Sequence, residues 1–362
     1  MTQASVTSEK VTLFPQDPQS RLTYRIPALL FIPPDTFLAF AEERSSPRDE
    51  DAKILVLRRG TKKENTVEWG PMEPLTSATK DGYRTMSPCP VYERESQTVF
   101  LFFNCVEGTV SEQEQIKTGK NAARLCYVCS TDAGQTWCSL TDLTEQVIGK
   151  DLKNWATFAV GPGHGVQLNS GRLVIPAYAY HITMIQEGDE TIKTLECQVA
   201  EVMHQEGDVQ YSVYCNARTP HGLRAEALST DEGLTFRSPS LQEELCETGT
   251  GCQGSVVSYT PTPGHGKTAS SWLLYSHPAD KQERKDLGIY LKTSPSEEAK
   301  WEGPWILHKG PSGYSDLAMC QGPPLLFGCL FECEKELKKE EIAFQLFTEE
   351  DLQKNIGFPP VD

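Results

Sequence analysis

The chain has 362 residues, of which 34 are Lys or Arg and 50 are Asp or Glu, giving a formal net charge of −16. Binders of nucleic acid and other polyanions need a basic surface, so this charge argues against that class, and an anionic ligand must meet a local cluster of arginines. The first ten residues contain no apolar segment of a signal peptide and no run of about 18 apolar residues occurs, so we expect neither a transmembrane segment nor secretion through a signal peptide.

Nothing in the composition divides the chain into parts. Its 27 Gly and 24 Pro residues are spread along the whole sequence, and no Ser/Gly-rich linker or abrupt change of composition marks a boundary. One large all-β domain can hold a chain of this length around a sizeable core. We therefore expect a single domain over residues 1–362.

The 12 cysteines are expected to be reduced and buried. Without a signal peptide disulfides are not expected, and free thiols pack well within apolar segments. The CxxC pattern at residues 126–129 is not expected to bind zinc, because the two side chains of a strand at this spacing face opposite ways and no second pair follows. The cysteines that lie within apolar segments include Cys105, Cys126, Cys215 and Cys329.

Short apolar runs bounded by turn residues recur along the chain and predict β-strands. The first two runs form a hairpin over residues 28–41 with its turn at Pro33-Pro34-Asp35, and the charged residues Glu42, Arg44 and Asp49 follow it. The other runs that we expect to form strands are residues 54–58, 99–103, 125–129, 172–178, 213–216, 255–259, 272–276, 288–291, 326–331 and 342–347.

Only two short helices are expected. Ser111, with Glu114 three residues later, forms a capping-box pattern and predicts a helix that ends before Gly119. A second helix is expected after Thr348. Many short strands with few helices indicate an all-β sandwich, barrel or propeller, and a propeller fits one domain of this length best.

A repeated eight-residue pattern supports the propeller. Ser-Thr-Asp-Ala-Gly-Gln-Thr-Trp at residues 130–137 is echoed by Ser-Thr-Asp-Glu-Gly-Leu-Thr-Phe at residues 229–236. Ser and Asp side chains accept backbone N–H groups in such turns, Gly adopts positive φ, and we expect the terminal aromatic ring to pack between layers. The copies lie 99 residues apart, which predicts blades of about 50 residues and about six or seven blades in total. A copy midway, near residue 180, is absent.

Two further patterns are interpreted as structural. The glycine-rich segment at residues 161–165 resembles a phosphate-binding loop, but it lacks the third glycine and a following helix, so we expect a turn. The seven histidines are too dispersed to argue for a metal site, and we expect His164 and His277 to be structural.

Three arginines stand at the borders of expected strands: Arg25, Arg218 and Arg284. Each one alone would be interpreted as a surface arginine. Three guanidinium groups at one centre would repel one another unless they hold an anion, and their geometry suits a carboxylate. The sequence does not show whether they converge.

Glu196 and Tyr314 are the candidates for catalysis. Glu196 lies in an apolar setting and Tyr314 in the turn-like Gly-Tyr-Ser-Asp at residues 313–316, so either could be purely structural. A carboxylate nucleophile would be repelled by a substrate that carries its own carboxylate at the reacting carbon. A neutral phenol that gives its proton to a glutamate would not be repelled, so this pair suits such a substrate.

With Tyr-Arg-Ile-Pro at residues 24–27, the two repeated turns and the tetrad at residues 313–316 in this order, the chain resembles the exo-α-sialidases of animals along essentially its whole length. Residues 155–165, 251–255 and 326–333 resemble the membrane-associated, ganglioside-cleaving member more than the cytosolic one. The resemblance implies an all-β fold, a six-bladed β-propeller with a central active site.

The resemblance also implies a role for individual residues. Tyr314 would be the nucleophile, Glu196 its base, and Asp49 the general acid that protonates the leaving oxygen. Tyrosine nucleophiles are known in sialidases as exceptions to the two-carboxylate rule of glycosidases. The carboxylate of sialic acid would be bound by Arg25, Arg218 and Arg284, with Glu332 holding Arg25. The resemblance implies that Glu42 and Arg44 line the ring-hydroxyl side of the site, with Ile26 as a further supporting residue. The residues that would line the N-acetyl and glycerol side are Met86, Glu112, Tyr178, Tyr180 and Gln253.

The chain departs from the family pattern at two places. Ser87 stands where Asn is common, which is expected to loosen one contact of the pocket. The interval between Tyr180 and Glu196 is about twenty residues shorter than the family pattern predicts, so one blade is expected to be incomplete.

The expected function is therefore the retaining hydrolysis of terminal sialic acid from gangliosides, glycoproteins and oligosaccharides, through a tyrosyl-enzyme intermediate and without a metal or other cofactor. Two alternatives stay open: a sialic-acid-binding propeller with weak turnover, because the shortened segment misplaces Glu196, and a scaffold propeller without affinity for the sugar. The resemblance implies peripheral association with the plasma membrane or an endomembrane, with the cytoplasm as the alternative. The net charge predicts no nucleic-acid partner.

Overall fold

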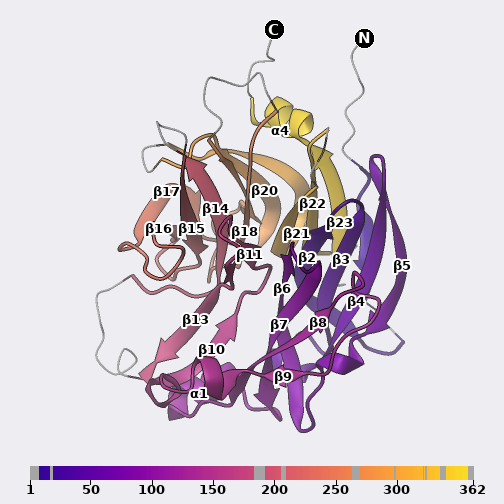
Figure 1. Cartoon of the computed structure of the whole chain (residues 1–362), viewed down its shortest axis with the longest axis vertical. Helices are drawn as coiled ribbons and strands as arrows, with labels where there is room; N and C mark the ends of the chain where they lie inside the picture. The colour runs from indigo at the N-terminus through magenta and orange to yellow at the C-terminus, as the bar shows by residue number, and fades with distance from the viewer. Residues whose placement is uncertain are drawn as a thin grey trace.

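Strands dominate the structure, a computed structural model that describes residues 8–16, 19–182, 192–204, 209–262, 270–296, 299–320, 322, 324–334 and 340–357 (Figure 1). The first sheet contains β2 (Thr23–Ile32), β3 (Thr36–Arg44), β4 (Ala52–Lys63) and β5 (Thr66–Pro74). The second contains β6 (Tyr83–Glu93), β7 (Thr98–Glu107), β8 (Ala123–Ser130) and β9 (Thr141–Asp142). Both are antiparallel with consecutive strands adjacent.

The middle of the chain forms two short sheets and then a longer one. The short sheets pair β10 (Trp155–Val160) with β13 (Ala177–His181), and β11 (Val166–Gln167) with β12 (Leu173–Val174). The longer sheet contains β14 (Cys197–His204), β15 (Gln210–Ala217), β16 (Leu223–Ser229) and β17 (Ser240–Cys246). The expected single strand over residues 172–178 is wrong: Pro176 has no N–H to donate to a ladder, and the chain divides there into β12 and β13.

The last sheet has the order β1-β23-β22-β21-β20-β19-β18. The long strand β21 pairs with β20 through its first half and with β22 through its second half, so it belongs to two groups of strands. The N-terminal strand β1 pairs with β23 and joins the two ends of the chain. The strands are β1 (Val11–Phe14), β18 (Ser255–Tyr259), β19 (Trp272–Pro278), β20 (Lys285–Lys292), β21 (Glu302–Cys320), β22 (Leu326–Glu334) and β23 (Glu340–Thr348).

Both expected helices are present. In α1 (Glu112–Thr118), the Ser111 side chain accepts a hydrogen bond from the Glu114 N–H, and Gly119 ends the helix with φ 65°. In α4 (Glu349–Ile356), Thr348 and Asp351 form a reciprocal capping box. The other short helical segments are α2 (Thr144–Val147) and the 3₁₀ turns η1 (Asp49–Asp51), η2 (Thr76–Ala78) and η3 (Leu152–Asn154). In the described parts of the chain, no helix has both the length and the apolar character that a membrane span requires.

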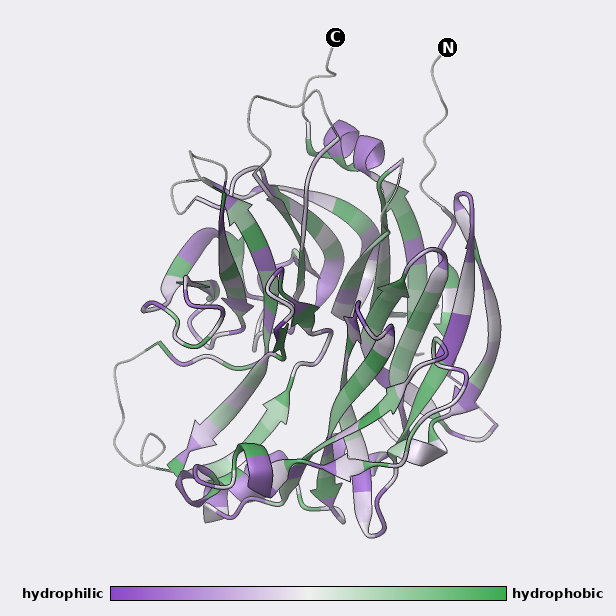
Figure 2. Ribbon diagram, in the orientation of Figure 1, coloured by the Kyte–Doolittle hydropathy of each residue, from purple (hydrophilic) through white to green (hydrophobic). Residues whose placement is uncertain are grey.

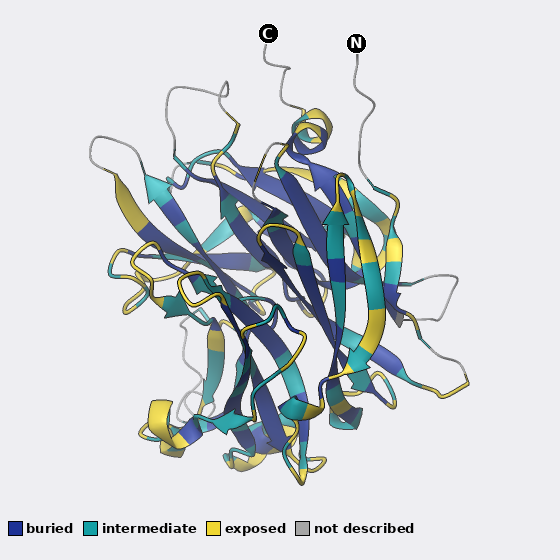
Figure 3. Cartoon of the chain, turned by 45° about the vertical axis from the view of Figure 1, so that its right-hand side comes forward, coloured by how far each residue is buried: buried dark blue, intermediate teal, exposed yellow. Residues whose placement is uncertain are grey.

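The sheets contact one another through a set of central strands, and these contacts form a closed circle. β2 contacts β6, which contacts β10 and β11; β11 contacts β14, β14 contacts β18, β18 contacts β21, and β21 contacts β2. Hydrophobic residues follow the strands and hydrophilic residues the connections (Figure 2). The strands in the middle of the molecule are buried, whereas exposed residues gather in turns and along β5 (Figure 3). The ends of these central strands therefore meet in one place.

The two repeated turns have the expected hydrogen bonds. The Ser130 hydroxyl accepts from the Gly134 N–H at 2.8 Å, and Ser229 accepts from the Gly233 N–H at 2.8 Å. The terminal rings differ: Trp137 packs at the edge of the core against Phe40, but Phe236 is 40% exposed. The prediction that both rings pack between layers is wrong for the second copy.

All 12 cysteines are free thiols, as expected, but the prediction that they are buried is wrong for some of them. Cys105, Cys126 and Cys329 are buried. The half-buried cysteines are Cys129, Cys138, Cys197, Cys215 and Cys246. His164 and His277 are structural, as expected. The ring of His164 hydrogen-bonds to Asp316 at 2.7 Å, and the ring of His277 hydrogen-bonds to the Pro278 carbonyl at 2.7 Å.

Candidate active site

A cavity of about 310 Å³ opens where the central strands meet. Its walls come from the first two sheets, from α1, β10 and β13, and from the segments beside β14, β15, β20 and β21. The predicted site residues that line it are Arg25, Ile26, Glu42, Arg44, Asp49, Met86, Glu112, Tyr178, Glu196, Arg218, Arg284 and Tyr314.

Tyr314 and Glu196 lie in direct contact although 118 positions separate them in the sequence. The Tyr314 hydroxyl donates to Glu196 Oε1 at 2.5 Å, and Arg218 Nη1 donates to the same oxygen at 3.0 Å. Burial, followed by the negative charge of Glu196, raises the pKa of Tyr314 above its ordinary value. The phenol is therefore neutral, and Glu196 lies in position to accept its proton.

The three predicted arginines converge. The guanidinium carbons of Arg25 and Arg284 lie 5.5 and 5.3 Å from the centre of the Tyr314 ring, and Arg218 Nη1 lies 3.4 Å from its hydroxyl. Arg218 Nη2 and Arg284 Nη2 each donate to a carbonyl oxygen of the loop between β17 and β18, at 2.7 and 2.8 Å. Arg218 Nε is buried without a hydrogen-bond partner among the described residues. The cluster therefore suits a ligand carboxylate.

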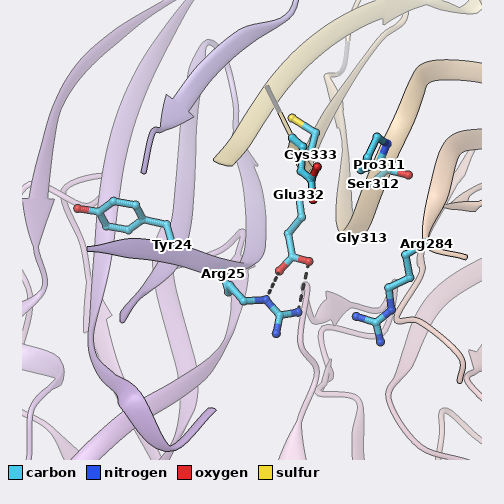
Figure 4. A pocket seen from close by; sticks show the side chains of 9 residues that line it. Tyr24, Arg25, Arg284, Pro311, Ser312, Gly313, Glu332 and Cys333 are labelled. Atoms are coloured by element: carbon cyan, nitrogen blue, oxygen red, sulfur yellow. Dashed lines mark hydrogen bonds and ion pairs between the residues drawn. The ribbon is translucent and has the colours of Figure 1, made fainter. Parts of the chain in front are cut away.

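Glu332 holds Arg25 from outside the cavity. Its carboxylate accepts from Arg25 Nε at 3.2 Å and from Nη2 at 3.4 Å (Figure 4), and from the backbone N–H groups of Ile26 at 3.0 Å and Tyr314 at 3.1 Å. Burial disfavours its charge, but Arg25 and these hydrogen bonds outweigh burial and lower the pKa of Glu332. A Cβ at Gly313 would meet Glu332 Oε2, so this close approach requires glycine. Glu332 thus fixes both the arginine and the backbone at the tyrosine.

The Arg25 side chain leaves β2 at an irregular point. The register of β2 against β3 shifts between Arg25 and Ala28, and Ile26 has φ 61°, which is rare for a β-branched residue. The extended backbone of β2 is thus interrupted one residue after Arg25. The hydrogen bond from the Ile26 N–H to Glu332 stabilises this bulge, which sets the direction of the arginine.

Arg44, Glu42 and Asp49 form a connected set on the opposite wall. The Arg44 side chain is fully buried and donates to Glu42 at 2.9 and 2.5 Å and to Asp49 Oδ1 at 2.7 Å. Glu42 also accepts from the N–H of Ser87, which has φ 58°. The Asp49 side chain is 60% exposed at the mouth of the cavity. It is thus anchored through Oδ1 and remains accessible from solvent.

Glu112 and Tyr178 form the third wall. The Tyr178 hydroxyl donates to Glu112 Oε2 at 3.2 Å. Burial and then the nearby charge of Glu196 raise the pKa of Glu112 to about 6. Met86 lies beside this wall and accepts a weak hydrogen bond from Arg84. A carboxyl group with a pKa of about 6 can accept a hydrogen bond from a polar ligand when ionised and donate one to it when protonated.

Two further predicted residues do not line the cavity. Tyr180 packs edge-on against Tyr178 with the ring centres 6.2 Å apart. Gln253 is fully buried: its amide donates to the Pro162 carbonyl at 3.3 Å and accepts from the Ser315 N–H at 3.0 Å. Gln253 therefore positions the backbone beside Tyr314 and makes no lining contact, contrary to its expected place on the N-acetyl and glycerol side.

The sequence analysis missed other lining residues. Arg84 follows Tyr83 as Arg25 follows Tyr24. Both strands contain a residue of positive φ before a proline, but Ile26-Pro27 comes directly after Arg25, whereas Thr85 and Met86 separate Arg84 from Ser87-Pro88. The shared Tyr-Arg pair is the signal that could have found Arg84, which lines the cavity. The remaining polar residues of the lining are Asn104, Gln115 and Thr157, of which Asn104 interrupts an apolar strand.

Comparison with known proteins shows the family to which the chain belongs. Residues 35–327 match the family described as BNR repeat-like domain. The chain is 49% identical to Sialidase-3 of Homo sapiens, over 97% of this chain and 95% of that protein, and 43% identical to Sialidase-2 of Mus musculus, over 90% and 92%. Its fold is similar to that of a microbial sialidase, Hz136, with a TM-score of 0.74 at 22% identity, over 94% of this chain and 68% of that one.

These matches define the class as glycoside hydrolases. The chain belongs to the animal sialidase family, with a higher identity to Sialidase-3 than to Sialidase-2. The resemblance that the sequence predicted is thereby confirmed.

Proposed function

We propose that the chain is a retaining exo-α-sialidase in which Tyr314 attacks the anomeric carbon of a terminal sialic acid. The observation that carries this proposal is the contact of 2.5 Å between the Tyr314 hydroxyl and Glu196, surrounded by three arginines. The arginines hold the substrate's carboxylate on the carbon that reacts. A neutral phenol approaches that carbon without the repulsion that a carboxylate nucleophile would meet.

The first half of the reaction transfers two protons. Glu196 accepts the proton of Tyr314 while the phenol oxygen bonds to C2 of the sugar, and the C2–O bond to the leaving group breaks. Asp49 donates its proton to the leaving oxygen. The position of Asp49 at the mouth supports this role, since the leaving group departs toward solvent there.

The second half releases the sugar. Asp49, now ionised, takes a proton from a water molecule that attacks C2 on the face from which the leaving group departed. The C2–O bond to Tyr314 breaks, and Glu196 returns the proton to the phenol. Two inversions at C2 give net retention.

The remaining lining residues suit the rest of the sugar. The Arg44 and Glu42 pair supports binding of ring hydroxyls, and Glu112, Tyr178 and Met86 support binding of the N-acetyl and glycerol groups. We assign Tyr180 and Gln253 to the support of this wall and of the Tyr314 backbone, because neither lines the cavity.

We propose further that residues 1–362 form a single six-bladed propeller. The closed circle of central strands and the pairing of β1 with β23 support this architecture. The two short sheets formed by β10 to β13 would be an incomplete third blade. The alignment with Sialidase-3 of Homo sapiens spans 410 positions, so that relative has residues that this chain of 362 lacks. Residues 183–191, within the interval expected to be short, lie outside the described part of the chain.

The alternative of a binding protein without turnover depended on misplacement of Glu196. Its contact with Tyr314 favours the enzyme instead. Substitution of Tyr314 by Phe tests this directly: it removes the attacking oxygen and keeps the ring between Arg25 and Arg284. We expect kcat on a fluorogenic sialoside to fall at least about 10³-fold. Binding of the dehydrated sialic acid analogue should stay within a few fold of wild type, and undiminished hydrolysis by the variant would refute the mechanism.

We propose gangliosides among the substrates and peripheral association with the plasma membrane or an endomembrane, with the cytoplasm as the alternative. The higher identity to Sialidase-3 than to Sialidase-2 supports this proposal. Cell fractionation tests it: the protein should sediment with membranes and be released by alkaline carbonate. Recovery of all protein in the soluble fraction without that treatment would contradict membrane association.

A further inference from the structure

The loop between β17 and β18, residues 247–254, holds two of the three arginines of the active site. Its backbone belongs to no strand or helix. The Thr250 carbonyl accepts a hydrogen bond from Arg218 Nη2 at 2.7 Å. The Gly251 carbonyl accepts one from Arg284 Nη2 at 2.8 Å. The directions of both guanidinium groups therefore depend on where the loop places these two carbonyl oxygens.

A buried ion pair fixes the backbone of this loop. The side chains of Glu247 and Arg224 are 1% and 0% exposed, and Arg224 Nη1 lies 2.8 Å from Glu247 Oε1. The N–H of Cys252 donates to Glu247 Oε2 at 3.2 Å, and the carbonyl of Cys252 accepts from Arg224 Nη1 at 2.7 Å. The loop has no strand partner for these buried backbone groups, so the ion pair supplies their hydrogen bonds directly after Gly251.

Glu247 also fixes the backbone beside Arg218. The N–H of Thr219, the residue after Arg218, donates to Glu247 Oε1 at 3.0 Å. A Cβ at Gly251 would lie only 2.6 Å from Arg218 Nε, so the loop and this arginine are in close contact. One carboxylate therefore holds both the backbone from which Arg218 starts and the loop to which its guanidinium is bound.

The ion pair is itself held by neighbouring strands. Arg224, in β16, donates through Nε to Asn216 Oδ1 of β15 at 2.8 Å. His277 Nε2, in β19, lies 3.2 Å from Glu247 Oε2. Burial disfavours the charge of Glu247, but Arg224 and His277 outweigh burial and lower the pKa of Glu247 to about 2. The carboxylate is therefore ionised and fixed relative to three strands.

Glu247 and Arg224 do not belong to the described lining of the cavity, so they can affect a ligand only through other residues. The side chain of Cys252, which they hold in place, packs with Ile26 and Tyr314 in a small apolar cluster. Two like-charged guanidinium groups repel each other before an anion arrives, and the carbonyl oxygens of a fixed loop counteract this repulsion.

We propose that Glu247, together with Arg224, is a positioning residue of the active site. It holds the loop at residues 247–254 so that Arg218 and Arg284 are directed at the substrate's carboxylate, and it thereby sets the preference of the site for that carboxylate. This inference rests on the proposed function and assigns a second layer of residues to it.

The test uses Glu247→Gln, which keeps the shape of the side chain and removes its charge. On a fluorogenic sialoside we expect KM to rise about 5- to 10-fold while kcat stays within about threefold. Calorimetry then compares the dehydrated sialic acid analogue with its methyl ester, which lacks the negative charge. The ratio of the two dissociation constants should fall about 5-fold or more toward unity, because the arginines no longer converge on the carboxylate.

Arg224→Lys gives a second variant should Glu247→Gln not fold. It keeps the buried positive charge, but a single amine cannot replace the planar guanidinium that bonds Glu247, Asn216 and the Cys252 carbonyl together. We expect the same direction of change in KM and in the ratio of dissociation constants, about 3-fold or more.

Glu226→Gln is the matched structural control. Glu226 is buried and pairs with Lys292 at 3.5 Å, but it accepts hydrogen bonds from two aromatic side chains instead of the loop. This variant should lose thermal stability while KM and the ratio of dissociation constants stay within about twofold of wild type.

An unchanged ratio in Glu247→Gln and Arg224→Lys, or an equal change in Glu226→Gln, would overturn the inference. Wild-type protein that hydrolyses no sialoside would instead contradict the proposed function, whereas the ratio is measured without turnover and still tests the role of Glu247.

Discussion

Two of the arginine–glutamate pairs around the site, Arg25–Glu332 and Arg218–Glu196, differ in how their carboxylates are used. Glu332 is saturated: it accepts from Arg25 through two nitrogens and from the N–H groups of Ile26 and Tyr314. Glu196 accepts from Arg218 and from the Tyr314 hydroxyl, and among the described residues no backbone N–H donates to it. The same two residue types therefore form an anchor in one place and, in the proposed mechanism, a proton acceptor in the other.

The difference indicates that the number of fixed hydrogen-bond donors around a carboxylate, rather than its residue type, distinguishes a supporting glutamate from one that can exchange a proton. A carboxylate that accepts several fixed donors has a lowered pKa and gains little from a further proton, as at Glu332. A carboxylate with a phenol at 2.5 Å can exchange that proton during the reaction. Substitutions of the two glutamates should therefore have different kinetic signatures.

Of the two glutamates, Glu196 is expected to show the larger effect on turnover, because Glu196→Gln removes the proposed base. We expect kcat on a fluorogenic sialoside to fall about 10²- to 10³-fold, with KM changing only a few fold, because Gln can still accept from Arg218. Steady-state kinetics measure this split. A variant whose KM rises while kcat is retained would assign Glu196 to binding and would remove the contrast with Glu332.

Glu332→Gln should give the opposite pattern. Loss of the charge beside Arg25 frees that guanidinium to move, so we expect KM to rise about 10-fold or more with a smaller change in kcat. The thermal midpoint should also fall, because a partly buried arginine loses its counter-charge, at a cost of about 2–3 kcal/mol. Parallel kinetics and thermal unfolding of the two Gln variants check this. Equal losses of kcat in both would contradict the comparison.

Gly313→Ala perturbs the anchor without changing any charge. The added Cβ would meet Glu332 Oε2, so the carboxylate must shift away from Arg25 and from the Tyr314 N–H. We expect an increase of KM of several fold and a loss of about 1–3 kcal/mol in the free energy of unfolding, measured by urea titration. Gly70→Ala is the matched control, since its nearest atom beyond its chain neighbours, the Arg59 carbonyl oxygen, is 3.3 Å away. Similar losses in both variants would mean that the effect is not specific to Glu332.

The smallest effect concerns Glu112, a glutamate that hydrogen-bonds to a tyrosine instead of an arginine. Burial and Glu196 raise its pKa from 4.5 to about 6 in the folded protein. The folded state therefore binds the proton more tightly than the unfolded state, and this contribution to stability is lost as the pH rises from 4.5 through 6, amounting to about 2 kcal/mol. Urea unfolding at pH 4.5 to 7 should show a smaller decrease with rising pH for Glu112→Gln. Identical pH profiles would refute the raised pKa.

The sequence predicted the fold where local signals were strong. Alternation and turn residues located most strands, and Ser111 and Thr348 located the two helices. The predictions failed where tertiary packing decided the outcome. The second repeated turn has the same hydrogen bonds as the first, yet Phe236 is exposed, because only the neighbouring strands determine whether that ring is covered.

Only some residues of the site were predicted correctly, for the same reason. Charged residues beside apolar strands, together with the family resemblance, indicated Arg25, Asp49 and Tyr314, and all three line the cavity. Gln253 and Tyr180 were expected there too, but a residue's type does not show whether it faces the cavity or supports the wall behind it. Arg84 was not predicted, because a single arginine beside a tyrosine does not show that its side chain faces the cavity.

The sequence by itself determined the class of this protein: an acidic, all-β chain whose arginines, tyrosine and acids occur in the order typical of a sialidase. Only the tertiary structure decided that these residues work together. Tyr314 and Glu196 come from segments 118 residues apart and meet only because the sheets bring them together. Local patterns encode strands and turns, whereas distances between remote side chains follow from how the sheets close on one another.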